Sequence, residues 1–131
     1  MKRLLSLFLL VAALFAADFD WVHSYDQALK LAKERNRPVM VMISQKDCPT
    51  CQYMEDVAFE DEELVDFVEH NFIPLKLDLQ RAKELGLKAY GTPTFYFLRP
   101  DGTKITRALV GGATARTFLE KLREIKAMYA R

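Results

Sequence analysis

The two cysteines of the sequence, Cys48 and Cys51, lie close together in the stretch KDCPTCQYM. Two thiols at this spacing suit three kinds of chemistry: a structural disulfide, half of a metal site, or a redox pair that cycles between dithiol and disulfide. A disulfide that closes so small a loop removes little entropy from the unfolded chain, so it is a poor structural staple. Zinc usually needs four ligands, and the chain adds two histidines, His23 and His70. These considerations favour the redox pair.

Methionines near the cysteines raise the alternative of a copper site. Met40 and Met42 take alternate positions in an apolar run, which is typical of core packing, and Met54 follows the cysteines. His70 stands beside Asn71 at the expected end of a helix, where a partly charged imidazole is favoured without any metal. A metal carrier is therefore a third class of function, and zinc or copper that copurified with the reduced protein would reveal it.

The residues around the cysteines predict a strand followed by a helix. The apolar run PVMVMIS, residues 38–44, is typical of a short strand buried on both faces. Pro49 suits the first position of a helix, because its missing N–H needs no partner there. Cys48 then lies at the N-cap or in the first turn, where free backbone N–H groups and the helix dipole stabilise a thiolate. Cys51 lies one turn further in and is more buried, so we predict that Cys48 is the nucleophile and Cys51 the resolving thiol.

The rest of the chain predicts an α/β fold with a central mixed sheet flanked by helices and a C-terminal antiparallel hairpin. Ser24 and Gln27 form a capping-box pattern at the start of a helix that runs to about Arg35. Counted from an extended segment at residues 18–22, the predicted order is β-α-β-α-α-β-α-β-β-α. The further elements are helices that begin near residue 60, at residue 80 and after Thr114, strands at 72–79, 94–98 and 104–110, and a hairpin turn at 99–103. Strands separated by helices are expected to pair in parallel, and the last hairpin to add an antiparallel edge.

Residues 1–17 predict a secretory signal peptide. A basic start at residues 2–3 is followed by an apolar run at residues 4–15 and by Ala16 and Ala17, which is the layout of such peptides. The run is shorter than the ~20 apolar residues that span a bilayer comfortably, although an uncleaved membrane anchor is the alternative. We predict cleavage near Ala16 or Ala17, which leaves residues 18–131 as one domain without membrane association.

The charge balance narrows the classes of partner. The 131 residues carry a formal net charge of +1, and without Lys2 and Arg3 the acidic residues outnumber the basic ones by one. Such a balance gives no reason to expect nucleic acid or an anionic membrane surface as a partner. Export would place the protein in a compartment where disulfides persist, and we predict a periplasmic monomer.

Two motifs together carry a resemblance to a known family. The C-P-T-C pair after an apolar strand, with GTPTFYF about forty residues later, resembles the thioredoxin superfamily. The stretch from Ser24 to Leu79 is more closely similar to the exported thioredoxin-like branch, which includes the C-terminal domain of the bacterial transmembrane thiol–disulfide interchange protein. The resemblance covers roughly residues 19–130. It implies a thioredoxin-like fold, exchange with protein thiols and disulfides, and no cofactor beyond the redox-active Cys48–Cys51 disulfide.

The resemblance also implies roles for single residues. Cys48 matches the attacking cysteine of the family, and Cys51 matches the resolving one. Pro93 in GTPT matches a cis proline that lies opposite the cysteine pair, and Thr92 matches the residue whose backbone receives a substrate strand. The alternative for Pro93 is an ordinary trans proline at the start of a strand.

Three features depart from the thioredoxin pattern. Asp47 replaces the usual tryptophan before the first cysteine, and its charge would oppose the helix dipole by disfavouring a thiolate there. Pro49 and Thr50 replace the usual Gly-Pro, and Met42 falls where a buried aspartate assists proton transfer in the family. Lys76 matches a lysine near that proton path, or is a strand residue whose ammonium group reaches solvent. We expect Asp47, Pro49, Thr50 and Lys76 to modulate the redox pair.

The sequence thus predicts a periplasmic thiol–disulfide oxidoreductase that uses its Cys-Pro-Thr-Cys pair on protein substrates. Its electrons would be exchanged with another thiol protein, such as a membrane thiol reductant or oxidant. The alternative is a redox-inert or redox-sensing module on the same fold that binds peptides beside Pro93, because a fold alone does not establish an activity. The intact cysteine pair favours the enzyme, and insulin reduction driven by dithiothreitol separates the two.

Overall fold

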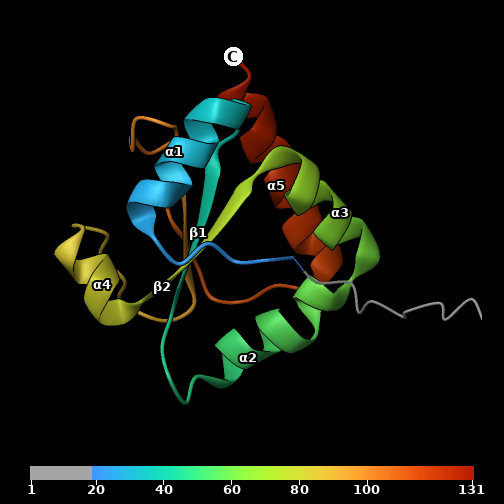
Figure 1. Ribbon diagram of the computed structural model, residues 1–131. Helices are drawn as coiled ribbons and strands as arrows, with labels where there is room; N and C mark the ends of the chain where they lie inside the picture. Colours follow the sequence, from blue (N-terminus) through green and yellow to red (C-terminus); the bar gives the residue numbers. More distant parts are fainter. Residues whose placement is uncertain (1–18) are drawn as a thin grey trace, which may run out of the picture.

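The computed structural model describes residues 19–131, so the predicted signal peptide lies outside the described residues. Four strands form one mixed sheet in the order β2-β1-β3-β4, and helices cover both of its faces (Figure 1). This architecture confirms the predicted α/β class. The helical elements are α1 (Tyr25–Arg35), α2 (Pro49–Asp56), the 3-10 turn η1 (Ala58–Glu60), α3 (Glu62–Asn71), α4 (Leu79–Glu84) and α5 (Ala115–Tyr129), and the strands are β1 (Val39–Ser44), β2 (Ile73–Asp78), β3 (Thr94–Leu98) and β4 (Leu109–Val110).

Strand β1 is buried along its whole length, because it lies between β2 and β3 and under helices on both faces. Met40 and Met42 pack into the core beneath α3 and α5, which is rich in phenylalanine rings. Val39, Val41 and Ile43 face the opposite core beneath α1 and α4. The prediction of a strand buried on both faces is therefore confirmed, and packing accounts for both methionines.

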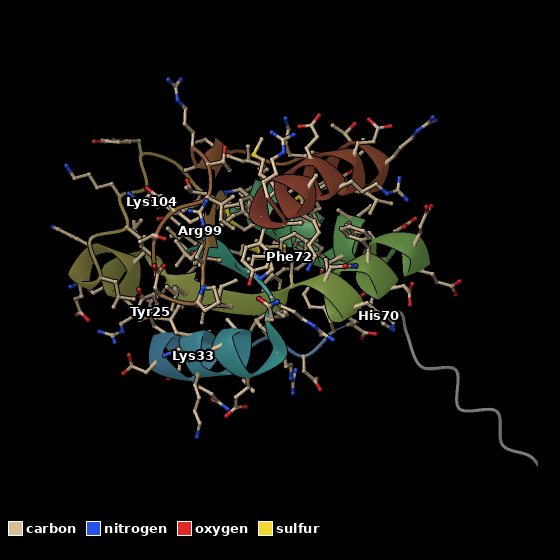
Figure 2. All side chains as sticks on the ribbon, turned by 90° about the horizontal axis from the view of Figure 1, so that it is seen from above. Tyr25, Lys33, His70, Phe72, Arg99 and Lys104 are labelled. Carbon is tan, nitrogen blue, oxygen red and sulfur yellow. A yellow bond between two sulfur atoms is a disulfide. The ribbon has the colours of Figure 1, made fainter. Side chains whose placement is uncertain are left out.

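At the C-terminal end of α3, one side chain is buried in the core beneath α5 and another is exposed to solvent. Phe72 ends α3 and is buried, with its ring 6.0 Å from that of Phe97 on β3. His70, two residues earlier, is exposed and pairs with Asp66 of the same helix at 3.3 Å. Figure 2 shows Phe72 enclosed beneath α5 and His70 at the outer side of α3. His70 therefore belongs to the end of a surface helix and lies away from the cysteines.

Side-chain caps fix where several helices begin. Ser24 Oγ accepts a hydrogen bond from the N–H of Gln27 at the start of α1, as the capping pattern predicted. Asp61 and Thr114 cap α3 and α5 in the same manner. Each cap satisfies an N–H group that has no partner within its helix and is worth about 1 kcal/mol. No helix within residues 19–131 is long and apolar enough to cross a membrane.

One predicted strand pairing is wrong, because β3 runs antiparallel to β1 although a helix precedes it. Strand β2 does pair with β1 in parallel, as expected. The connection explains the difference. Helix α4 has six residues and is therefore only about 9 Å long, whereas β2 has six residues and extends about 20 Å. Because α4 is too short to carry the chain back along the length of the sheet, β3 starts at the same end of the sheet at which β2 finishes.

The strand predicted at residues 104–110 is also shorter than expected. Only Leu109–Val110 forms β4, and Lys104 makes an isolated bridge to Leu98. Lys104 bridges to Leu98, and Leu109 pairs with Phe95. Five residue steps separate Lys104 from Leu109, whereas only three separate Leu98 from Phe95 on β3. The extra length has to leave the sheet as a bulge, which ends regular pairing.

Candidate active site

The cysteine pair lies where β1 ends and α2 begins. After Ser44, a short loop leads to Cys48, which is the N-cap residue of α2, and Pro49 takes the first helical position as predicted. Cys48 and Cys51 form a disulfide with their Cα atoms 5.3 Å apart. The N–H of Cys51 donates to Sγ of Cys48 at 3.2 Å. The sulfur thus takes the capping role that serine, threonine and aspartate oxygens have at the other helices.

The two cysteines differ in burial. Cys48 retains 7% of its surface exposed and Cys51 only 2%. This order agrees with the expectation that Cys48 lies nearer to solvent. The assignment of Cys48 as nucleophile and Cys51 as resolving thiol stays a prediction, and the geometry gives it a basis because an incoming sulfur reaches the more exposed cysteine first.

The second predicted motif lies directly against the first. The Thr92–Pro93 peptide bond is cis, the isomer that the resemblance implied. The carbonyl oxygen of Thr92 lies 3.4 Å from Sγ of Cys48, and a thiol at Cys48 can donate to it. The hydroxyl of Thr92 donates to the same sulfur, also at 3.4 Å. The sequence pointed only to the backbone of Thr92, so this side-chain contact is an addition.

The rim around Thr92 is apolar and accessible. Tyr90 is 92% exposed and Val110 is 67% exposed. Gly112, in the loop after β4, lies against Thr50 between the two cysteines: a Cβ atom at Gly112 would stand 2.8 Å from Cγ2 of Thr50. Thr50 therefore does contact the surroundings of the redox pair, and the close approach of this loop requires a glycine.

The lysine expected near the proton path has an unexpected partner. Met42 is fully buried and lies beside Lys76 in the register of β1 and β2. Lys76 forms an ion pair with Glu55, one helical turn beyond Cys51 on α2. Oε1 of Glu55 is buried and accepts no hydrogen bond from another group among residues 19–131. Glu55 thus places a carboxylate on α2 beside Lys76, whereas the resemblance puts an aspartate at the strand position of Met42. The four-residue spacing of Glu55 from Cys51 was the signal available in the sequence.

A polar pocket of about 660 Å³ reaches the disulfide from another side, and both cysteines line it together with the Lys76–Glu55 pair. Asp47 lies in its wall with φ at 59°, a left-handed conformation that aspartate adopts more readily than most residues. His23 also lines the pocket. The predicted first strand is reduced to one bridge between Val22 and Leu75, and this bridge brings His23 to the site.

The described residues show no arrangement that resembles a metal centre. No group of three or more His, Cys, Asp or Glu side chains within residues 19–131 is placed to hold an ion. Met54 is buried, and its sulfur lies 3.4 Å from the N–H of Ala113. The polar groups around the sulfur pair include the Thr92 hydroxyl, which contacts Sγ of Cys48, and the Glu55 carboxylate, which lines the same pocket as both cysteines.

Comparisons with known proteins place the chain in a family. A family model described as a thioredoxin-like domain matches residues 25–126. Anterior gradient protein 3 of Xenopus tropicalis is 33% identical over 87 residues, which cover 66% of this chain and 53% of that protein. The chain thus spans about half the length of the anterior gradient proteins that it matches.

Solved structures show the same fold. A thioredoxin from Thermus thermophilus is 28% identical with a TM-score of 0.68, over 85% of this chain and 88% of that one. DsbH oxidoreductase is 21% identical with a TM-score of 0.71, over 86% and 87% of the two chains. The oxidised C-terminal domain of Neisseria meningitidis DsbD is 21% identical with a TM-score of 0.62, over 80% and 98%.

The family match includes both motifs on which the resemblance depended, the cysteine pair and Thr92–Pro93. The structures of lower identity support the shared fold. Because the family model covers most of the described residues, the chain belongs to the family of thioredoxin-like domains.

Proposed function

We propose that the protein is a thiol–disulfide oxidoreductase that acts on the cysteines of protein substrates in the periplasm. The observation that carries this proposal is the environment of Cys48. Its sulfur accepts hydrogen bonds from the N–H of Cys51 and the hydroxyl of Thr92. Both donors, together with the positive end of the α2 dipole, stabilise negative charge on this sulfur. The thiolate is the reactive form of cysteine, so these contacts favour Cys48 as the nucleophile.

The reaction follows from the positions of the two sulfurs. In the reducing direction, the Cys48 thiolate attacks one sulfur of a substrate disulfide, and the other substrate sulfur leaves as a thiolate. Cys51 then loses its proton and attacks Sγ of Cys48, which releases the second substrate thiolate and forms the disulfide of the structure. Two electrons pass from the protein to the substrate. The same steps in reverse oxidise a substrate dithiol.

Glu55 is placed to take the proton from Cys51. The two residues are one turn apart on α2 and line the same pocket, and the ion pair with Lys76 holds the Glu55 carboxylate in position. The buried Oε1 has no hydrogen-bond donor besides Lys76 within the described residues, so it is free to accept the thiol proton. Lys76 thus acts as a positioning residue for the carboxylate.

The proposal includes location and partners. The basic start and apolar run of residues 1–17 support export with removal of a signal peptide. The protein then works as a monomer without a cofactor and exchanges electrons with a membrane thiol reductant or oxidant. N-terminal sequencing of periplasmic material is expected to give Ala17 or Asp18 as the first residue. A dominant product that still carries Lys2 would show a retained anchor.

Insulin reduction by dithiothreitol tests the activity. The protein is expected to accelerate the precipitation of insulin chains, and the double variant Cys48→Ser/Cys51→Ser is expected to match dithiothreitol alone. If the unaltered protein also matches dithiothreitol alone, the proposal is wrong and a peptide-binding module remains. A redox titration against glutathione then sets the direction of electron flow, since ~30 mV of potential corresponds to ~1.4 kcal/mol.

A further inference from the structure

The polar pocket beside the disulfide has a location suited to a small ligand. It lies at the carboxyl ends of the parallel neighbours β1 and β2, between α2 and α4. In open α/β sheets, ligands bind in the crevice outside the carboxyl ends of the strands. The volume of about 660 Å³ falls within the range of roughly 300–1,000 Å³ that small-molecule sites have. Thr92 and Pro93 do not line this pocket, so it is a separate approach to the same sulfur atoms.

The charges around the pocket are balanced. Three basic side chains and three acidic ones line it: Lys46, Lys76, Arg81, Asp47, Glu55 and Asp78. A ligand of one charge sign, such as a phosphate, would meet as many like charges as opposite ones. A ligand that carries both signs can meet opposite charges at each end. The lining therefore favours a zwitterion.

Among residues 19–131, some of these charges have no partner. Lys76 is paired with Glu55, Arg81 with Glu84, and Asp78 accepts the N–H of Arg81 at the start of α4. Lys46 and Asp47 are consecutive and exposed, and neither makes a hydrogen bond or an ion pair within the described structure. A small molecule with both kinds of group would pair its carboxylate with Lys46 and its ammonium group with Asp47.

We propose that this pocket binds a small disulfide or thiol that carries both an ammonium and a carboxylate group, of the cystine or glutathione kind. The inference rests on the proposed redox function and adds a second class of substrate to it. Lys46 and Asp47 bind the charged groups of the ligand, and Arg81 borders the ligand on the α4 side. The sulfur of the ligand then lies beside the cysteine pair.

The small disulfide is itself the electron acceptor in this exchange. The Cys48 thiolate of the reduced protein attacks one sulfur of the small disulfide, and the first small thiolate leaves. Cys51 attacks Sγ of the mixed disulfide, and the second small thiolate leaves with the protein disulfide closed. The protein loses two electrons and the small disulfide gains them, while the two protons of the dithiol pass to the two small thiolates. No other reductant or oxidant is required.

Oxidation rates of the reduced full chain by four disulfides test the inference. The probes are glutathione disulfide, cystine, the dication cystamine and the neutral bis(2-hydroxyethyl) disulfide, each followed by acid quenching and mass spectrometry. Cystine carries ammonium and carboxylate groups in equal number, and glutathione disulfide carries both kinds with an excess of carboxylates. One or both of these two probes are expected to react at least ~10-fold faster than the neutral probe, and cystamine is expected to gain no such advantage. The comparison of glutathione disulfide with cystine identifies which of the two the pocket fits.

Variants assign the preference to the pocket. Lys46→Gln and Arg81→Gln are each expected to lower the rate with the preferred ammonium- and carboxylate-bearing probe, relative to the rate with the neutral probe, by about threefold to tenfold. Lys83→Gln, on α4 but outside the pocket lining, is the matched control and is expected to leave the ratio unchanged. Equal rates with all four probes, or a ratio that neither pocket variant alters, would overturn the inference. If insulin is reduced in that case, the proposed function stands and only the pocket assignment fails.

Discussion

The disulfide has one apolar approach and one charged approach. On the first, the Thr92–Pro93 segment lies beside the exposed side chains of Tyr90 and Val110, and the carbonyl oxygen of Pro93 already accepts the N–H of Gly111. On the second, acidic and basic side chains in equal number surround the pocket at the ends of β1 and β2. We propose that this apolar approach receives protein substrates at the backbone of Thr92, because backbone groups are common to every polypeptide and suit substrates of many sequences. Under the two proposals made above, the charged approach selects ligands by their charges, and one sulfur pair serves two kinds of substrate.

The two cysteines are divided between these approaches. Sγ of Cys48 contacts Thr92 on the apolar side. Cys51 is more buried and shares α2 with Glu55, whose carboxylate lies in the charged pocket. Under the proposed function, substrates meet Cys48 first, and the proton of Cys51 leaves toward the Glu55 carboxylate on the charged side.

The largest expected effect comes from separating the two cysteines by mutation. Cys51→Ser is expected to accumulate mixed disulfides with periplasmic proteins, because Cys48 still attacks and no thiol resolves the product. Cys48→Ser is expected to trap few or none, and both variants to reduce insulin no faster than dithiothreitol alone. Non-reducing gels with mass spectrometry measure the trapped species. Trapping by Cys48→Ser instead would reverse the roles assigned to the two sulfurs.

Glu55→Gln is the next largest change, and it shows whether the charged side takes part in the chemistry. The variant keeps the shape of the side chain but accepts no proton, so closure of the protein disulfide is expected to slow by roughly 10²-fold, the lower end of general acid–base effects. Rapid-quench kinetics of mixed-disulfide resolution measure this step. The effect should be the same for protein and small substrates, because the attack of Cys51 on the mixed disulfide releases both.

Asp56→Asn is the control for Glu55→Gln, because Asp56 is the exposed carboxylate next to it on α2. It is expected to change the resolution rate by less than about twofold. Equal slowing by both variants would assign the effect to the overall charge of α2. No slowing by Glu55→Gln would remove Glu55 from the mechanism and leave water as the proton acceptor.

The sequence revealed the apolar approach far better than the charged one. Cys48, Cys51 and Thr92–Pro93 belong to two short motifs. Each motif can be recognised from a few consecutive residues without knowledge of the fold. The residues that line the pocket come from the segment before α1, the end of β1, the β1–α2 loop, α2, β2 and α4. Charged residues in such segments resemble any solvated surface until the fold brings them together. The ion pair of Glu55 with Lys76 depends on a long-range contact in the same way.

The sheet shows a similar limit. Periodicity and breakers located the helices and strands, but the direction of β3 depends on how far α4 can carry the chain. The short length of that helix was already visible between Asp78 and Gly86, and the general expectation of parallel pairing across helices outweighed it. The short β4 follows from the bulge between Lys104 and Leu109, which the alternation of residues in that segment did not reveal.

Gly112→Ala tests how tightly the apolar side is built around the cysteine loop. The new Cβ would stand 2.8 Å from Cγ2 of Thr50, so the free energy of unfolding is expected to fall by about 2 kcal/mol, as in other overpacked sites. Urea unfolding of the oxidised protein measures the loss. Thr50→Ser removes the clashing methyl group, and the double variant is expected to recover most of the stability.

Gly91→Ala is the matched control for Gly112→Ala. A Cβ atom at Gly91 would meet Val110 at 3.7 Å, an ordinary contact. Its effect on stability is therefore expected to stay within about 0.5 kcal/mol. If Gly112→Ala is equally mild, the loop after β4 is able to shift, and the apolar approach is less rigid than the structure indicates.

The smallest expected effect concerns the hydroxyl of Thr92, which contacts the sulfur of Cys48 on the apolar side. Thr92→Val removes the hydroxyl that donates to Sγ of Cys48 at 3.4 Å but keeps the volume of the side chain. A hydrogen bond to a charged group is worth about 1.5–3 kcal/mol, and the long contact to sulfur places this one at the lower end, which corresponds to roughly a tenfold loss of thiolate at neutral pH. Iodoacetamide is therefore expected to alkylate Cys48 of the reduced variant about tenfold more slowly at pH 7, whereas Thr92→Ser retains the donor and the wild-type rate. The N–H of Cys51 and the helix dipole remain in both variants, so neither should abolish reactivity. An unchanged rate in Thr92→Val would mean that the helix start alone activates Cys48, and that the apolar side contributes shape but no charge stabilisation.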